Sequence, residues 1–192
     1  MKIKFPFKNH ISHGFFAYLA IIILVPLLCS YSIHLKTRPK DYERFTFFSE
    51  ALFVNDGEFK DLMFEVIPED LLIDLYEMER SDRLFNTYLS SYGFSSDICL
   101  LSETTLSNFK TIPFLDLSGT SLEKENNYVI DGHEIGVLYH TKEDEKPDDL
   151  FTFAEDNYYL CIIKDSVHLL GLGQEGKTNQ VSRVMEYLVP HE

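Results

Sequence analysis

The chain has 192 residues, of which 45% are hydrophobic and 14% aromatic, and its formal net charge is −14. This hydrophobic share is enough for a packed core and excludes an intrinsically disordered chain. The acidic excess argues against nucleic-acid binding, because such binding depends on lysine and arginine side chains that neutralise phosphates. A well-solvated acidic surface is the simpler interpretation of the charge.

The charges are distributed unevenly along the chain. The first forty residues hold six of the 17 basic residues and no acidic residue, whereas the remainder holds 11 basic and all 31 acidic residues, a net −20. The uncharged stretch from Gly14 to Ile33 is long enough, as a helix, to cross the ~30 Å hydrocarbon core of a bilayer. We therefore predict a basic tail over residues 1–13, a transmembrane signal anchor over 14–33, a tether over 34–43 and one domain over 44–192.

Two comparisons favour an anchor that is not cleaved. The apolar stretch is longer than the ~7–15 residues of a cleaved signal peptide, and Leu28 replaces the small residue that precedes an acylated cysteine such as Cys29. Basic residues flank both sides, so the positive-inside rule gives no clear orientation. Because short anchors followed by one large domain usually export that domain, we expect a single-pass cell-membrane protein whose C-terminal domain is extracytoplasmic.

The first half of the domain alternates strands and helices. Strands are expected over residues 44–54, 71–78 and 97–101, with helices over 56–67 and 82–92 and a short helix opening at Ser102. Asp56 and Asp82 are the expected N-caps, and Gly93 is expected to end the second helix. The order predicts an α/β fold: a single three-layer domain with a mixed, mostly parallel sheet.

The second half of the domain differs in pattern. A brief extended piece is expected over residues 114–117, and a β-hairpin over 128–139 turns at Asp131-Gly132. A charged surface loop follows over residues 141–149, and one or two strands are expected over 158–172. The apolar spacing of residues 179–188 predicts a closing amphipathic helix.

The cysteines and histidines form no recognisable site. Cys29, Cys99 and Cys161 match no zinc or redox spacing, so buried free thiols are expected. A disulfide between Cys99 and Cys161 requires their strands to be neighbours. The histidines and the acidic loop lack the spacing of zinc and calcium sites, and we expect neither a metal nor another cofactor.

Several segments carry a family resemblance. They are FTFFSEA (45–51), SSDICLLSE (95–103), YVIDGHEIGV (128–137), and LCIIKDSVHLLGL (160–172) followed by NQVSRVMEYLV (179–189). Together they resemble one lobe of the extracytoplasmic solute-binding proteins of ABC transporters, the maltose-binding-like class. The resemblance implies a truncated, membrane-anchored, non-enzymatic module that binds a small solute or a partner protein such as a permease.

The same resemblance places four residues at the ligand side of the sheet: Ser49, Glu50, Ser102 and Glu103. In open α/β sheets, ligands bind outside the carboxyl ends of the strands. We therefore predict these four as ligand-binding residues. The structural alternative is that Ser49 is an ordinary loop residue and that Ser102 and Thr104 cap the following helix.

A second motif leaves another function open. Residues 171–178, GLGQEGKT, match the phosphate-loop pattern and lie between an apolar strand and a helix. In a nucleotide-binding domain, Gly171, Gly176, Lys177 and Thr178 would contact phosphates. Too few residues follow Thr178 for a later magnesium-binding strand, so a glycine-rich turn is the competing interpretation. A structural subunit of a membrane complex is a third possibility.

Overall fold

The computed structural model describes residues 21–28, 43–67, 71–109, 113–144, 148–169 and 180–189. The chain divides into two compact units, Met1–Pro39 and Lys40–Glu192. Residues 21–28 form a helix in the first unit. Across the described parts of the chain, no helix has the length and apolar character needed to span a membrane, which contradicts the predicted transmembrane helix over residues 14–33. The basic tail and most of the tether lie outside the described residues.

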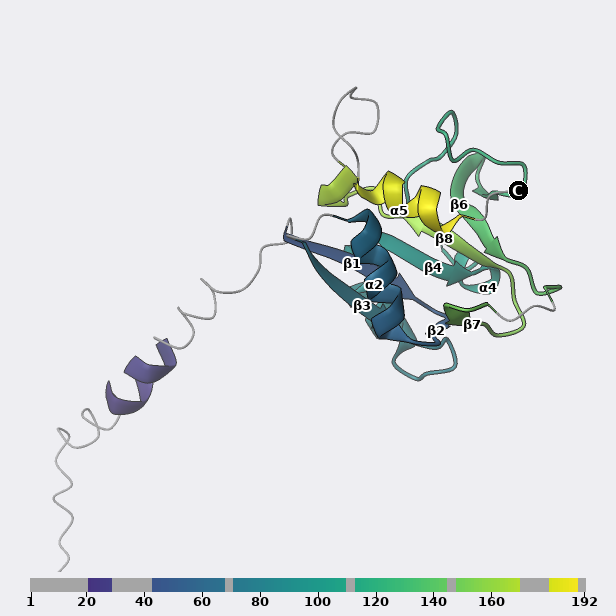
Figure 1. Cartoon of the computed structure of the whole chain (residues 1–192). Coiled ribbons are helices and arrows are strands. Elements are labelled where there is room, and N and C mark those ends of the chain that lie inside the picture. Colours follow the sequence, from purple (N-terminus) through teal and green to yellow (C-terminus); the bar gives the residue numbers. More distant parts are fainter. Residues whose placement is uncertain are drawn as a thin grey trace, which may run out of the picture. The chain divides into compact units, whose positions relative to one another are not determined.

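A six-stranded mixed sheet forms the centre of the second unit (Figure 1). In spatial order its strands are β3 (Leu72–Glu77), β1 (Arg44–Ser49), β4 (Ile98–Ser102), β8 (Tyr158–Ile162), β6 (His133–His140) and β5 (Tyr128–Ile130). Strand β1 is parallel to β3 and β4, whereas the β4–β8, β8–β6 and β6–β5 pairs are antiparallel. A two-stranded antiparallel sheet joins β2 (Leu52–Phe53) to β7 (Phe151–Thr152).

The α/β class and the mixed sheet are confirmed, but the expectation of a mostly parallel sheet is wrong. Helical crossovers connect β1, β3 and β4, and such connections allow parallel pairing. The later strands follow one another through a tight turn and a surface loop. Strand β8 consequently lies between β4 and β6 and runs antiparallel to both.

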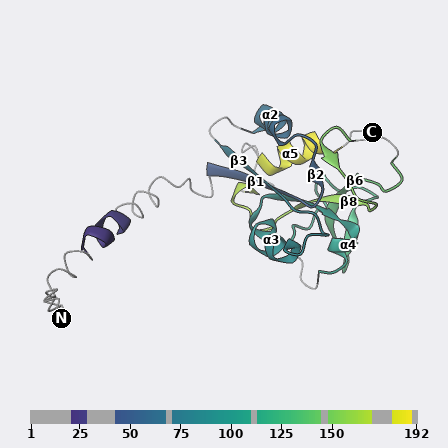
Figure 2. The same ribbon diagram turned by 90° about the horizontal axis from the view of Figure 1, so that it is seen from below.

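Helices cover both faces of this sheet (Figure 2). Helices α2 (Asp56–Val66) and α5 (Gln180–Leu188) share a core with Phe47 and Leu100 on one face. Helices α3 (Phe85–Ser91) and α4 (Glu103–Leu106) share a core with Phe48 and Leu101 on the other. Adjacent residues of β1 and β4 therefore contribute to opposite cores, because successive strand side chains point to opposite faces.

Capping differs in detail from the sequence expectation. Helix α2 is capped by Asn55 rather than Asp56: the Asn55 Oδ1 atom accepts hydrogen bonds from the backbone N–H groups of Gly57 and Glu58, at 3.1 and 3.3 Å. Asp82 accepts from the Leu84 N–H at 2.7 Å, but α3 begins at Phe85 without a side-chain cap. Asp82 therefore closes the turn before the helix.

Shorter elements complete the domain. The hairpin between β5 and β6 turns at Asp131 and Gly132, with φ of 51° and 85°, as two-residue turns with positive φ at both positions require. Two 3₁₀ helices, η2 (Gly93–Ser95) and η3 (Val167–Leu169), follow α3 and β8. The predicted extended piece near Phe114 is reduced to one bridge with Ile163.

Candidate ligand-binding site

A pocket of about 330 Å³ lies where the parallel strands end. Strands β1, β3 and β4 run in the same direction, so their carboxyl ends reach the same edge of the sheet. Four parts of the chain line the pocket. They are Glu50 just after β1 with Leu52 of β2, the segment after β3 (Glu79, Arg80 and Ser81), Ser102 of β4 with Thr104 of α4, and the β7–β8 region (Thr152, Phe153, Ala154, Glu155, Asp156 and Tyr158). We call it the carboxyl-end pocket.

Glu50 is a buried acid at the wall of this pocket, with 3% of its surface exposed. Its carboxylate accepts hydrogen bonds from the Ser102 N–H at 2.9 Å, the Ser102 hydroxyl at 2.8 Å and the Thr105 hydroxyl at 3.0 Å. The backbone N–H of Glu50 donates to the Leu100 carbonyl at 2.9 Å. Glu50 thus connects the end of β1 to the turn between β4 and α4.

Ser102 also caps α4. Its Oγ atom accepts a hydrogen bond from the Thr105 N–H at 3.2 Å. Capping residues satisfy backbone donors that a helix start leaves unpaired. The capping interpretation of Ser102 therefore holds in this structure, and Ser102 is in addition a donor to Glu50.

The segment before β8 forms the facing wall and is bonded to the start of α4. Asp156 Oδ2 accepts from the Thr104 hydroxyl at 2.5 Å and from the Thr104 N–H at 3.2 Å. The Asn157 side-chain amide donates to Glu103 at 2.6 Å, and the Glu103 N–H donates to the Asn157 carbonyl at 2.8 Å. Two loops distant in sequence are consequently held together at the pocket.

The four predicted site residues all lie at this edge, but they differ in their surroundings. Glu50 and Ser102 line the pocket. Ser49 is fully buried, and its hydroxyl donates to the Ala51 carbonyl at 2.5 Å. Glu103 contacts Asn157. Neither Ser49 nor Glu103 lines the pocket. Of the four, only Glu50 and Ser102 lie at its wall, and with 3% and 1% of their surfaces exposed they offer a solute little direct contact.

Nine of the 13 lining residues carry a hydroxyl or carboxylate group and one, Arg80, is a cation, while polar and apolar atoms contribute equally to the pocket surface. Burial raises the pKa of the Tyr158 phenol. The Ala154 N–H, which donates to the Tyr158 oxygen at 3.3 Å, lowers this pKa, whereas the charges of Glu50, Asp156 and Glu79 raise it further. Tyr158 is therefore a neutral phenol at physiological pH. A solute that forms several hydrogen bonds suits this lining better than an apolar one.

The residues from β7 to β8 were not expected at the site. Phe153 stacks on His140 with ring centroids 4.0 Å apart, and it contacts Tyr158 with tilted rings whose centroids are 4.8 Å apart. The sequence signal for this segment was the polar stretch ahead of the apolar run Tyr158–Ile162. That signal could mark a strand start, but only the antiparallel direction of β8 brings its start to the carboxyl ends of β1 and β4.

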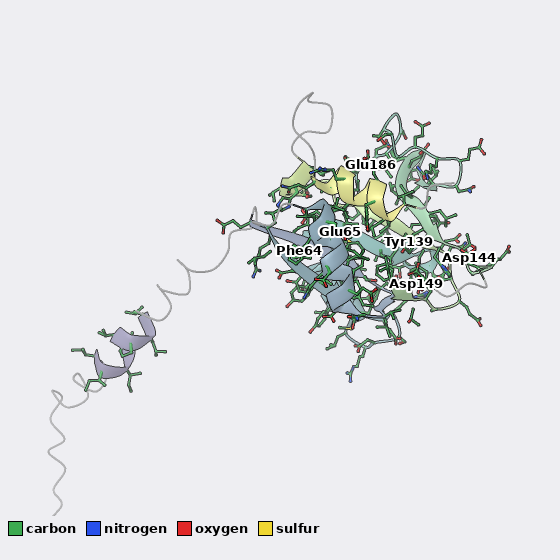
Figure 3. All side chains as sticks on the ribbon, viewed as in Figure 1. Phe64, Glu65, Tyr139, Asp144, Asp149 and Glu186 are labelled. Atoms are coloured by element: carbon green, nitrogen blue, oxygen red, sulfur yellow. The ribbon has the colours of Figure 1, made fainter. Side chains whose placement is uncertain are left out.

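A second pocket, of about 660 Å³, shares the residues from Thr152 to Glu155 with the first. Its remaining wall includes His140, Asp144 and Asp149, and Figure 3 labels Tyr139, Asp144 and Asp149 on this side of the domain. Tyr139 donates to Asp148 at 3.1 Å, and burial, followed by the Asp148 charge, raises the Tyr139 pKa.

A second buried acid lies at the opposite end of β4. Asp97 is 4% exposed. It accepts from the Thr46 N–H at 2.7 Å, the Thr46 hydroxyl at 3.1 Å, the Ser166 hydroxyl and the His168 Nδ1 atom at 2.9 Å. It lines neither of the pockets described above. This cluster connects β1, β4 and the segment after β8.

The phosphate-loop motif, with Gly171, Gly176, Lys177 and Thr178, lies outside the described residues. In the part of the chain that the structure describes, no group of three or more His, Cys, Asp or Glu side chains is placed to hold a metal ion.

Comparisons with known proteins give no match for this chain, whether with family models, curated proteins or solved structures.

Proposed function

We propose that the domain is a non-enzymatic binding module that takes a small polar solute in the carboxyl-end pocket. The observation that carries this proposal is the pocket itself: about 330 Å³ at the common end of β1, β3 and β4, with a polar lining. Solute pockets of open α/β sheets occur outside the carboxyl ends of the strands. The volume is at the lower end of the ~300–1,000 Å³ that small-molecule sites occupy, which favours a small solute.

The hydrogen bonding of the site favours binding over catalysis. A general base needs a carboxylate within reach of a substrate proton. Both Glu50 oxygens already accept hydrogen bonds from Ser102 and Thr105. The Ser102 hydroxyl is 1% exposed and donates to Glu50, so it is poorly placed to attack a solute. We assign Glu50 a positioning role, in which it holds the β4–α4 turn at the wall of the pocket.

The resemblance to one lobe of a solute-binding protein is consistent with this function. A lobe of that kind offers one wall of a cleft, and a second wall comes from another lobe. We propose that a partner chain, such as a permease, supplies the second wall when the solute is bound. The carboxyl-end pocket would then be both the solute site and the centre of the partner contact.

A solute panel tests the proposal on the full-length chain. Glucose, maltose, glycerol, the twenty amino acids and trialanine are titrated separately and followed by saturation-transfer NMR. We expect at least one to bind with a Kd below about 1 mM. Binding by no member of the panel would contradict the proposal of a solute-binding module.

A matched pair of variants tests the location. Ser81 is exposed and lines the carboxyl-end pocket but not the second pocket, whereas Ser91 is exposed at the end of α3 and lines neither pocket. Ser81→Trp places a large side chain in the carboxyl-end pocket and should weaken binding of the panel solute by about tenfold or more, equal to ~1.4 kcal/mol. Ser91→Trp should leave the affinity unchanged. Equal effects of the two substitutions would show that the solute binds elsewhere.

A further inference from the structure

The two cysteines of the domain are direct cross-strand partners. In the antiparallel pairing of β4 with β8, Cys99 is opposite Cys161. Both side chains are fully buried and belong to the same hydrophobic core, so they project from the same face of the sheet. Both are free thiols in this structure. We propose that Cys99 and Cys161 form a disulfide across β4 and β8 when the chain folds in the presence of a disulfide oxidant.

The Cα spacing suits such a bond, whereas the Cβ atoms, roughly 5–5.5 Å apart in a hydrogen-bonded pair, must move to the roughly 3.5–4.5 Å of a disulfide. The Ile163 N–H donates to the Asp97 carbonyl at 3.1 Å, and the Glu103 N–H donates to the Asn157 carbonyl at 2.8 Å. Asp97–Ile163 and Glu103–Asn157 are therefore hydrogen-bonded pairs of this register. Because hydrogen-bonded and non-hydrogen-bonded pairs alternate along an antiparallel ladder, Cys99–Cys161, two residues from the first of these pairs, is also hydrogen-bonded, with Cα atoms about 5.5 Å apart. Disulfides bridge Cα atoms that are roughly 4.4–6.8 Å apart.

Each sulfur has a weak partner that it gives up when the bond forms. The Cys99 thiol donates to the Gly93 carbonyl at 3.1 Å, and the Cys161 thiol is 3.9 Å from the Tyr159 carbonyl. The Cys161 sulfur occupies space left by Gly136, where an added Cβ would be 2.9 Å from it. For the bond to form, each sulfur must turn from these positions toward the opposite strand by rotation about χ1. Thiols are weak hydrogen-bond donors, so little is lost in the rotation.

Burial decides when the reaction occurs. The thiolate is the nucleophile in thiol–disulfide exchange, and burial raises the pKa of both thiols, with Cys161 adding to the rise at Cys99. The folded domain therefore protects its thiols, and exchange takes place while the chain is still open. One thiolate attacks glutathione disulfide and releases one glutathione. The second protein thiolate then attacks the mixed disulfide and releases the other, so two thiols are oxidised and one disulfide is reduced.

The bond would fix the floor of the carboxyl-end pocket. Strand β4 ends at Ser102 and β8 begins at Tyr158, and these two pocket residues are themselves register partners. A link between Cys99 and Cys161 prevents the two strands from separating or shifting register. The inference does not depend on the proposed solute, because it concerns only the strand pairing.

Mass spectrometry of the full-length chain with Cys29→Ser tests the proposal. The reduced, unfolded chain is refolded with either glutathione disulfide or dithiothreitol, then unfolded in N-ethylmaleimide. After oxidative refolding we expect no maleimide adduct, a mass lower by two hydrogens, and one peptide linking Cys99 to Cys161. The dithiothreitol sample should carry two adducts. The oxidised domain should melt about 10 °C higher, because the bond closes a long loop in the unfolded chain.

Controls separate this bond from other oxidations. In the same background, Cys99→Ser or Cys161→Ser leaves one thiol, which should carry either maleimide or a single glutathione. Glutathione disulfide added to the already folded, reduced chain should leave both thiols unmodified. Cell-free synthesis in an oxidising extract provides the same readout without refolding. Two maleimide or two glutathione adducts on oxidatively folded chain, or a disulfide that links separate chains, would overturn the proposal.

Discussion

A buried carboxylate lies at each end of strand β4, that of Asp97 at one end and that of Glu50 at the other. At its amino end, Asp97 is buried and accepts hydrogen bonds from Thr46, Ser166 and His168. Beyond the end of the neighbouring strand β1, Glu50 is buried and accepts from Ser102 and Thr105 at the carboxyl end of β4. Only Glu50 borders the carboxyl-end pocket.

The comparison shows that a buried acid is not by itself evidence of a functional site. Burying a carboxylate is costly unless hydrogen bonds and opposite charges compensate it. Both acids are compensated and both join segments distant in sequence. The difference lies in the backbone: the carboxyl ends of three parallel strands leave a pocket beside Glu50. Substitutions at the two ends should therefore affect stability in both cases and binding in only one.

The largest effect on stability is expected from Asp97→Ala. Removal of the carboxylate leaves the buried donors of Thr46 and His168 without this acceptor. Breaking such a buried network costs about 3–5 kcal/mol. Urea unfolding followed by circular dichroism measures the loss. Asp165 is an exposed acid in the same segment as Ser166, and Asp165→Ala should change stability by less than about 0.5 kcal/mol. Similar values for the two variants would contradict the structural role of Asp97.

A smaller loss, about 1–3 kcal/mol, is expected from Glu50→Gln. The amide oxygen replaces only one of the two carboxylate oxygens, so the amide NH₂ group faces either the Ser102 N–H or the hydroxyls of Ser102 and Thr105. The β4–α4 turn should loosen, and affinity for a panel solute should fall together with stability. The matched variant is Glu155→Gln, because Glu155 is exposed and lines the same pocket. If Glu155→Gln destabilises the domain as much as Glu50→Gln, the positioning role of Glu50 is wrong.

The smallest effect on stability is expected at Asp116, an exposed acid that, like Asp97, is hydrogen-bonded to a histidine and a serine. Hydrogen bonds from the His133 ring, and then from the Ser118 hydroxyl and N–H, lower the pKa of Asp116. Because the pKa is lower in the folded state, the stabilisation is present above the unfolded pKa of about 4 and is lost as the pH falls through the folded value. His133→Ala should raise the Asp116 pKa toward its ordinary value, as measured by carboxyl NMR titration.

The Asp144 carboxyl is the internal control for that titration. Hydrogen bonds from Thr141, the backbone N–H first, lower its pKa, with a minor contribution from His140. His133→Ala should leave the Asp144 pKa unchanged. A change at both carboxyls would show that the substitution alters the domain more widely than the loss of one hydrogen bond.

The sequence predicted the elements that depend on residues close together in the chain. The period of apolar residues located α5, and the Asp131-Gly132 pair located the hairpin turn. Helix α3 begins later than expected, because Asp82 bonds to Leu84 within a turn instead of capping the helix. Strand β7 was not anticipated: it has two residues, and its pairing with β2 depends on segments far apart in the chain.

Prediction of the site was limited by the same dependence on distant pairings. Glu50 follows β1 and Ser102 ends β4, two strands whose parallel arrangement the strand–helix order indicates, so their proximity was foreseeable. Tyr158 and Asp156 reach the pocket only because β8 is antiparallel to β4. No local pattern in residues 153–162 specifies that direction, so this wall of the pocket became visible only in the folded domain.

The most direct test of the carboxyl-end pocket is an NMR titration of the isotopically labelled full-length chain with a solute from the panel. Amide shifts at Thr104, Glu155 and Tyr158 report on the pocket, and those at Thr46 and Ser166 report on the Asp97 end. We expect shifts concentrated in the first group and absent from the second. Shifts centred on Thr46 and Ser166, or spread equally over both groups, would contradict the assignment of the binding site to the carboxyl ends of the strands.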